Sequence, residues 1–205
     1  MRLGRKTMRQ PNDRCSRDCA GEPLLVAPII SFDAVDATQG NRMLVAWGHR
    51  MGPVNRPMGA TWWHALHHNG EPVAVVCAAA LICERVAGFD RSEAVELARL
   101  CAVRPDLCRP TLRLWREFVL PALQRAHGYQ WAVSYQDEAL HSGNVYRFDG
   151  WVDLEQSRSG TDLRSNRKGR SKRIWAWPRD AAQIHAERRP DKTAVRAYLT
   201  QEQPR

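Results

Sequence analysis

The sequence predicts an α/β protein in which a mixed central β-sheet is flanked by helices, with basic extensions at the N- and C-terminal ends. Three stretches carry this prediction. Residues 131–154 read as a strand, a polar turn, a short helix and a second strand. Residues 61–80 read as a hairpin around Asn69-Gly70, and residues 111–126 read as an amphipathic helix. Strands that alternate with helical patterns are typical of one sheet covered by helices.

Charge is distributed unevenly along the 205 residues, whose net charge is +9. Residues 1–19 carry +4, residues 20–156 carry −3, and residues 157–205 carry +8. We therefore predict a disordered basic arm over 1–22 and a folded domain over 23–156. A basic Trp-containing segment over 157–178 is joined to the domain, and 179–205 form a polar tail or frayed helix. Segregated basic arms favour a polyanionic partner, although such arms are also often only solvated tails.

Other features of the composition restrict location and redox state. The six cysteines do not have zinc-site spacings, and we interpret them as reduced thiols. The N-terminus lacks the apolar segment of a signal peptide, and no apolar run reaches eighteen residues. We therefore expect a cytoplasmic protein with no membrane partner.

The first elements are predicted from a short apolar run and a capping residue. Residues 23–30 indicate an edge strand that Pro28 interrupts. Ser31 or Asp33 would then cap a helix that ends before Gly48, as one helix or as two short ones. His49 follows in a loop rich in glycine and proline. Its side chain either takes part in chemistry or simply complements the helix dipole.

The next stretch predicts two paired strands. Residues 61–68 and 72–80 flank Asn69-Gly70, a strong hairpin-turn signal, and the second strand is apolar enough to be buried on both faces. Three histidines in the first strand suggest a metal, but strand alternation separates them, and polar ends on a solvent-facing strand explain them equally well: His64, His67 and His68.

Residues 93–103 fit a strand or a helix, and we choose the strand because Arg104-Pro105 ends it and a clear helix follows. That helix carries an apolar stripe of Leu112, Trp115, Phe118, Val119, Ala122, Leu123 and Ala126. We expect a kink at Pro121 and an end at Gly128.

Four polar side chains lie within ten residues after the strand at 131–135: Asp137, His141, Asn144 and Tyr146. Because ligands of α/β folds bind at the carboxyl ends of strands, this turn is the predicted site. Each residue also has a purely structural interpretation. Asp137 is a good helix cap, Asn144 could cap the helix too, and Tyr146 could pack the helix on the sheet.

Tyr146 stands four residues before Gly150-Trp151, and this pattern resembles the last motif of the GNAT acyltransferases. The resemblance implies a GNAT-like fold with a catalytic domain over 23–156, and an acetyl-CoA donor. It implies Tyr146 as the acid that protonates the leaving thiolate. It places coenzyme A at Arg104, Arg109, Thr111 and Asn144, with the pyrophosphate at the loop and helix start. The glycines of the usual phosphate loop are absent here.

A longer phrase, Asp137 followed by His141-Ser142-Gly143, Tyr146-Arg147 and Gly150-Trp151, resembles the Mom family of phage proteins. That family modifies adenine in DNA by methylcarbamoylation. The resemblance implies transfer to adenine N6, double-stranded DNA as partner, and protection from restriction. It also implies that His49, Asp137 and Tyr146 converge, where they would suit iron, although we assign no metal ligand from the sequence. His141 is a further candidate base or base-edge contact. His49 precedes Arg50, where the family has Tyr.

Basic residues beside two tryptophans predict a nucleic-acid contact. The candidates are Arg164, Arg167, Lys168, Arg170, Lys172, Arg173, Trp175 and Trp177. The tryptophans could instead cover a sheet edge. Three hypotheses follow. The chain modifies adenine in DNA, acetylates a small amine or a protein, or is a non-catalytic GNAT-like protein that binds nucleic acid.

Overall fold

The computed structural model describes residues 30–56, 59–157 and 172–189 and confirms the predicted fold class. A seven-stranded mixed sheet has the order β1-β2-β3-β6-β7-β9-β8. Its strands are β1 (Ile30–Val35), β2 (Thr61–His68), β3 (Glu71–Ala80), β6 (Ala94–Ala102), β7 (Trp131–Asp137), β8 (Val152–Ser157) and β9 (Lys172–Trp177). All neighbours are antiparallel except β6 and β7. A small separate sheet pairs β4 (Arg85–Val86) with β5 (Phe89–Asp90).

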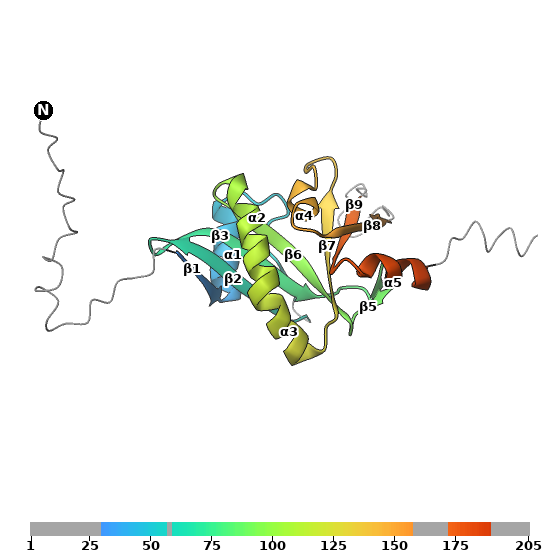
Figure 1. The fold of residues 1–205 in the computed structure, drawn as a ribbon. Helices are drawn as coiled ribbons and strands as arrows, with labels where there is room; N and C mark the ends of the chain where they lie inside the picture. Colours follow the sequence, from blue (N-terminus) through green and yellow to red (C-terminus); the bar gives the residue numbers. More distant parts are fainter. Residues whose placement is uncertain (1–29, 57–58, 158–171, 190–205) are drawn as a thin grey trace, which may run out of the picture.

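Helices cover both faces of this sheet (Figure 1). A long helical segment crosses one face and comprises η1 (Pro105–Leu107), α2 (Cys108–Leu114), η2 (Trp115–Val119) and α3 (Leu120–His127). It buries Leu112 and Trp115 against the sheet. The opposite face receives α1 (Ala37–Ala46), whose Leu44 is fully buried. A third cluster lies under β7, β9 and α5 (Ala181–Arg188). None of the helices in the described residues is long and apolar enough to cross a membrane.

The beginning of the described chain differs from the prediction. Residues 31–35 form part of β1 and pair with β2, whereas the sequence predicted a helix capped by Ser31 or Asp33. The helix is instead capped by Asp36, whose carboxylate accepts from the Gln39 N–H, while the Gln39 side chain accepts from the Asp36 N–H. This capping box satisfies two backbone donors at the helix start, so the helix begins later. Residues 23–29 of the predicted strand lie outside the described residues.

The hairpin prediction is confirmed. Asn69 and Gly70 connect β2 and β3, and both have positive φ angles, +52° and +82°, as a two-residue turn of this kind requires. Ala74–Ala79 of β3 are fully buried, as the apolar run predicted. The strand predicted at 93–103 is also confirmed as β6.

The long helix forms as predicted, but Phe118, Ala122 and Ala126 of the predicted apolar stripe are exposed. A π-helical turn at Trp115–Val119 lets the Leu120 N–H bond the Trp115 carbonyl, directly before Pro121. This turn shifts the phase of the buried stripe by one residue. Leu120 is therefore buried, while Phe118, predicted to lie in the core, is 67% exposed. The helix ends before Gly128, as expected.

The last strand of the described chain, β9, is an inner strand of the sheet and not an edge strand. β9 lies between β7 and β8 and pairs with both. Of the predicted helix between residues 138 and 150, only α4 (Asn144–Arg147) forms, because the preceding residues make a turn on Asp137. That turn and α4 lie at the carboxyl end of β7 (Figure 1).

Candidate active site

A cleft opens where β6 and β7 separate. Pairing between these parallel strands extends from Ala94–Trp131 to Leu97–Ser134 and ends there. At the same level β6 has an irregularity, with Leu97 and Arg99 opposite Ala78 and Cys77 of β3. A bulge of this kind bends a strand, and bulges are frequent beside active sites. Figure 1 shows the two strands parting toward α4. The resulting cleft has a volume of about 750 Å³.

The cleft brings together five of the residues predicted for catalysis or cofactor binding. Its lining includes His49 from the loop after α1, and Asp137, His141, Asn144 and Tyr146 from the end of β7, the following turn and α4. Cys108 and Pro105 line it at the start of the long helix. Residues separated by nearly a hundred positions in sequence therefore border one space, which is the arrangement that the prediction at this turn required.

Tyr146 lies at the closed end of the cleft, where the strands meet. Its Oη is 2.8 Å from the Ser134 Oγ, which also donates to the Leu97 carbonyl at 3.0 Å. Its ring stacks on Trp175, with centroids 5.6 Å apart, and meets the edge of Trp151. Burial raises the pKa of the Tyr146 phenol, and the hydrogen bond to Ser134 opposes this shift. The phenol therefore stays protonated at neutral pH and can serve as a proton donor.

The turn that carries His141 is attached to the sheet through Gln136. The Gln136 side chain donates to the His141 carbonyl at 2.5 Å and accepts from the Trp175 indole N–H at 2.7 Å. Gly143 has a φ of +74°, and a side chain there would collide with Gln136 and Trp175. The sequence therefore needs glycine at this position so that the turn can approach β7.

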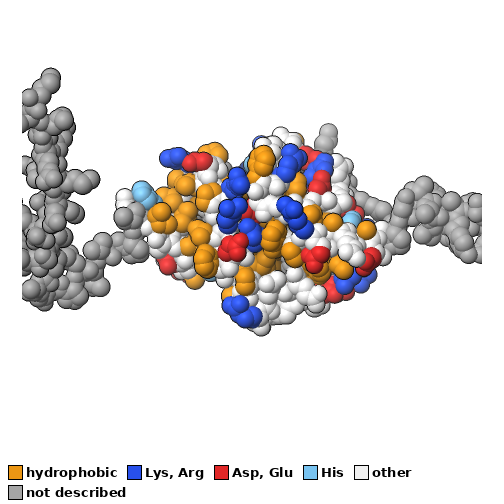
Figure 2. Space-filling view, viewed as in Figure 1, with side chains coloured by type: hydrophobic (Ala, Val, Ile, Leu, Met, Phe, Trp, Pro, Cys, Tyr) orange, Lys and Arg blue, Asp and Glu red, His pale blue; other side chains and the backbone are white. Residues whose placement is uncertain are grey.

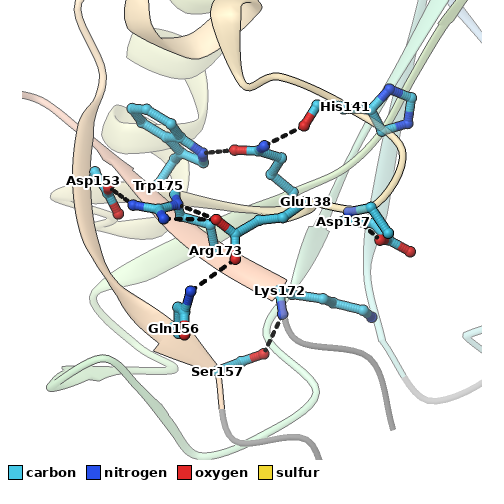
Figure 3. A network of polar contacts seen from close by, with 11 residues as sticks. Asp137, Glu138, His141, Asp153, Gln156, Ser157, Lys172, Arg173 and Trp175 are labelled. Atoms are coloured by element: carbon cyan, nitrogen blue, oxygen red, sulfur yellow. Dashed lines mark hydrogen bonds and ion pairs between the residues drawn. The ribbon is translucent and has the colours of Figure 1, made fainter. Parts of the chain in front are cut away.

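Arg173 fixes the same turn from β9. Its guanidinium donates to the Glu138 carboxylate at 2.6 Å and pairs with Asp153 on β8. Figure 3 shows this network, with the side chains of Asp137, His141 and Lys172 extending together toward one side, away from Arg173. Asp137 is buried, and its carboxylate accepts from the Ala139 N–H in the turn. It does not cap a helix as predicted, because the next helix, α4, begins only after Gly143.

His49 borders the cleft from the opposite wall. Its backbone N–H bonds the Leu44 carbonyl at 2.8 Å, which places the residue directly after α1. Its Nδ1 is buried and has no hydrogen-bond partner among the described residues. Burial, together with the nearby Arg99 guanidinium and the His141 ring, lowers the pKa of His49 to about 4. The imidazole is therefore neutral at neutral pH.

Three residues in the cleft were not predicted from the sequence. Glu96 is 7% exposed and forms an ion pair with Arg56 at 2.8 Å. Arg99 lines the cleft and donates to the Gly52 carbonyl, and Ser134 contacts Tyr146. Glu96 and Arg99 stand inside an apolar strand pattern, and a buried charge there is costly without a function or a partner. Charged residues inside an apolar strand were therefore the sequence signal that could have identified Glu96 and Arg99. Nothing in the sequence distinguishes Ser134.

The predicted coenzyme residues at the start of the long helix have separate positions. Arg104 is exposed and pairs with Asp106, and Arg109 is exposed and donates to the Phe148 carbonyl at 3.0 Å. Thr111 is fully buried, and its hydroxyl donates to the Leu107 carbonyl. In this conformation the hydroxyl is therefore not accessible to coenzyme A, contrary to the predicted contact. Pro105 and Pro110 lack N–H groups, which removes two donors for a phosphate. Figure 2 shows Lys and Arg side chains gathered on the face that carries α2 and α4.

The predicted nucleic-acid residues divide into four groups. Trp175 is 3% exposed and lies in the core, so in this conformation a nucleic-acid base cannot stack on its ring as predicted. Arg173 is held in its two ion pairs, and Trp177 is half-buried under the Arg116 guanidinium at 4.3 Å. Lys172 lines the cleft. Arg164, Arg167, Lys168 and Arg170 lie outside the described residues.

Two further chemistries concern the cleft: metal binding and nucleophilic attack by a thiol. The described part of the chain has no group of three or more His, Cys, Asp or Glu side chains placed to hold a metal ion, and Tyr146, the third predicted iron ligand, is bonded to Ser134. Burial raises the pKa of the Cys108 thiol to about 11. That thiol is protonated at neutral pH and is a poor nucleophile.

The fold is that of the GNAT acetyltransferases. An acetyltransferase from Salmonella typhimurium that modifies the N-terminal serine of a 50S ribosomal subunit protein superposes with a TM-score of 0.51 at 10% identity, over 74% of this chain and 95% of that chain. Arabidopsis thaliana NAA60 in complex with acetyl-CoA gives 0.51 at 12% identity, over 72% and 97%. A probable GNAT-family acetyltransferase from Chromobacterium violaceum gives 0.50 at 13% identity, over 77% and 91%.

Neither protein-family models nor curated protein sequences match the chain. The structural likeness at these identities shows the fold alone. Nothing in the comparisons bears on the Mom family specifically, and that resemblance stays a prediction.

Proposed function

We propose that this chain is an N-acyltransferase that moves an acyl group from a coenzyme A thioester to an amino group. One observation carries the proposal: the cleft between the separated ends of β6 and β7 closes on the protonated phenol of Tyr146. Three other residues that line the same cleft, His49, Asp137 and His141, can accept a proton or hydrogen bond, so acid and base functions share one space.

The donor would enter between the two strands. The facing edges of Ala98–Ala102 and Tyr135–Gln136 border the cleft beyond the last strand pair. An extended arm with amide groups can add to such edges through main-chain hydrogen bonds. A coenzyme A thioester has such an arm and, when bound, supplies the acyl group. The exposed guanidiniums of Arg104 and Arg109 would hold its phosphates, since two prolines limit the N–H groups available there.

The residues of the chain would supply the proton transfers. Tyr146 remains a neutral phenol at neutral pH and gives a proton to the leaving group. His49 is neutral at the same pH and accepts a hydrogen bond or proton from the acceptor nitrogen. Because the low pKa of His49 makes it a weak base, this wall of the cleft suits an amino group that is already uncharged. Asp137 and His141 orient the acceptor from the opposite wall.

The experiment is an acyl-transfer assay on the full chain with acetyl-CoA and a panel of amines, in which released thiol is measured. Tyr146→Phe should lower kcat by about 100-fold or more, the usual effect of losing a general acid, without changing the Kd for acetyl-CoA. Tyr129→Phe is the matched control, since Tyr129 packs with Trp62 and His127 outside the cleft. Acetyl-CoA that neither binds nor reacts would reject the proposal.

A second acceptor, the N6 amino group of adenine in DNA, is favoured by the charge of the cleft. Arg50, Arg99 and Lys172 line it, while Glu96, one of its two acids, is neutralised by Arg56. A cationic cleft disfavours polyamines and favours an acceptor joined to phosphate. The adenine amino group is uncharged at neutral pH, which suits the weakly basic His49. The target base would have to leave the duplex stack to reach the cleft.

Mass spectrometry of nucleosides from bacteria that express the chain would test this acceptor. A heavier deoxyadenosine, absent when Asp137→Ala or Tyr146→Phe is expressed, is the expected result. Unmodified nucleosides from cells with well-folded protein, together with acetylation of amines in vitro, would exclude adenine and retain the first proposal.

A further inference from the structure

Ser134 stands at the point where the cleft closes. It forms the last pair between β7 and β6, opposite Leu97, and it is 2% exposed. Its Oγ contacts two oxygen atoms, the Leu97 carbonyl at 3.0 Å and the Tyr146 Oη at 2.8 Å. The hydroxyl thus joins the end of the sheet pairing to the phenol in the cleft.

The direction of these two hydrogen bonds follows from counting protons. A serine hydroxyl has a single proton, and a carbonyl oxygen can only accept. Ser134 therefore donates to Leu97, and the Tyr146 phenol must be the donor in the contact between the two hydroxyls. The phenol proton is thus held at the closed end of the cleft.

The ring of Tyr146 does not need this contact for its position. Trp175 stacks on one side at an interplanar angle of 20°, and Trp151 meets the ring at 65°. Val145 and Tyr146 also pack against the main core cluster. Removing the serine hydroxyl should therefore leave the ring in place and change only the environment of the phenol oxygen.

We propose that Ser134 is a positioning residue for acyl transfer, whose hydroxyl holds the phenol proton of Tyr146 and turns toward the phenolate once that proton has been given up. The inference rests on the proposed function of Tyr146 as the acid. The bond from the acceptor nitrogen to the acyl carbon forms, the carbon–sulfur bond breaks, and the departing sulfur takes the phenol proton. The proton released by the nitrogen leaves through His49 or water, and one from solvent restores the phenol.

Ser134 would favour this transfer through a change in its hydrogen bond to Tyr146. The serine hydroxyl accepts a hydrogen bond from the neutral phenol, and it can donate one to the phenolate. When Tyr146 loses its proton, rotation of the serine hydroxyl exchanges a bond to the neutral Leu97 carbonyl for one to an anion. Hydrogen bonds to charged groups are the stronger kind. Without the hydroxyl, the buried phenolate has lost its donor, and the phenol becomes a weaker acid.

The first test reads the phenol directly and needs no substrate. Difluorotyrosine, a more acidic analogue, is placed at position 146 of the full chain, and its ionisation is followed by fluorine NMR. Ser134→Ala should raise the midpoint by about one pH unit. Ser134→Thr, which keeps the hydroxyl, should restore it, and Ser134→Cys, a weak donor, serves if the threonine variant does not fold. Ser157→Ala, which removes a hydroxyl bonded to the Lys172 N–H, is the matched control.

The second test is kinetic. With acetyl-CoA and the best amine acceptor, Ser134→Ala should lower kcat by about 10-fold with KM for the donor unchanged, and Ser134→Thr should recover the rate. An unchanged midpoint of ionisation would overturn the proposed hydrogen bond from the Ser134 hydroxyl to the Tyr146 phenolate. A raised midpoint with unchanged kcat would overturn the positioning role alone. If Tyr146→Phe has no effect on the rate, the proposed acid itself fails, and that result is distinct from either outcome at Ser134.

Discussion

The two ends of the cleft are held in different ways. At the end formed by β7 and α4, contacts join residues far apart in sequence: Trp175 bonds Gln136 across 39 positions, and Arg173 bonds Glu138 across 35. At the start of the long helix, two of the polar contacts are local. Arg104 pairs with Asp106, two residues away, and Thr111 bonds Leu107, four residues away. Longer-range contacts here are made by exposed or half-exposed arginines: Arg109 donates to the Phe148 carbonyl just after α4, and Arg113 pairs with Asp149.

This difference shows which part of the site is prepared before a ligand arrives. Groups that transfer protons must be placed within a fraction of an ångström, and buried long-range contacts provide this placement. Arginines that attract phosphates can be exposed and adjustable, because a charge acts over a longer distance. We therefore expect substitutions at the β7 end to change folding and rate, and substitutions at the helix start to change donor affinity.

The largest effect is expected from Trp175→Ala. Its indole is buried among Tyr146, Gln136 and the core, so truncation should reduce the free energy of unfolding by about 3–5 kcal/mol. Urea unfolding measures this loss, and Trp177→Ala, at a half-buried neighbour, should cost clearly less. A stable Trp175→Ala protein that loses only nucleic-acid binding would restore the sequence-based interpretation of this tryptophan.

Arg173→Gln should have a moderate effect. The guanidinium is one third exposed and pairs with Glu138 and Asp153, so the free energy of unfolding should fall by about 1 kcal/mol. Because the pairs hold the turn with Asp137 and His141, kcat should fall as well. Arg85→Gln removes the exposed pair with Asp90 and provides the comparison, with little change in either quantity. Equal effects of both substitutions would contradict a bracing role for Arg173.

The pH dependence of stability should contain a contribution from His49. Its pKa falls from 6.5 in the unfolded chain to about 4 in the folded protein, so between these values only the unfolded chain binds the proton. The stability contribution is therefore complete above pH 6.5 and is lost as the pH falls toward 4. His49→Gln should lose less stability than the wild type between pH 7 and pH 5, measured by urea unfolding. His127→Gln, at an exposed histidine outside the cleft, should follow the wild type.

The smallest effect on folding is expected from Arg104→Ala. Its ion pair with Asp106 is exposed, so the free energy of unfolding should hardly change. The Kd for acetyl-CoA should rise several-fold if this arginine holds phosphates, as calorimetry would show. Arg125→Ala, an exposed arginine on α3, is the control. An unchanged Kd would remove Arg104 from the donor site.

Local patterns were sufficient for much of the fold. Asn69-Gly70 specified the hairpin, the apolar run in β3 specified its burial, and the stripe with Leu112 and Trp115 specified the helix. These signals depend on neighbours in the sequence, so one chain is enough to read them. Patterns failed where a competing local contact intervened, as at Asp36, whose capping box starts α1 only after residues 31–35 have formed a strand.

The sequence by itself thus determined the class of fold and the order of most elements, and it predicted the turn after β7 as the site. Only the tertiary structure decided which residues meet there. It brought His49 to Asp137 and Tyr146, added Ser134 and Glu96, and placed Trp175 in the core, away from solvent. The physical reason is the same in each case. Whether a tryptophan or a serine serves packing or chemistry depends on the strands beside it, and β6 and β9 join β7 from distant parts of the chain.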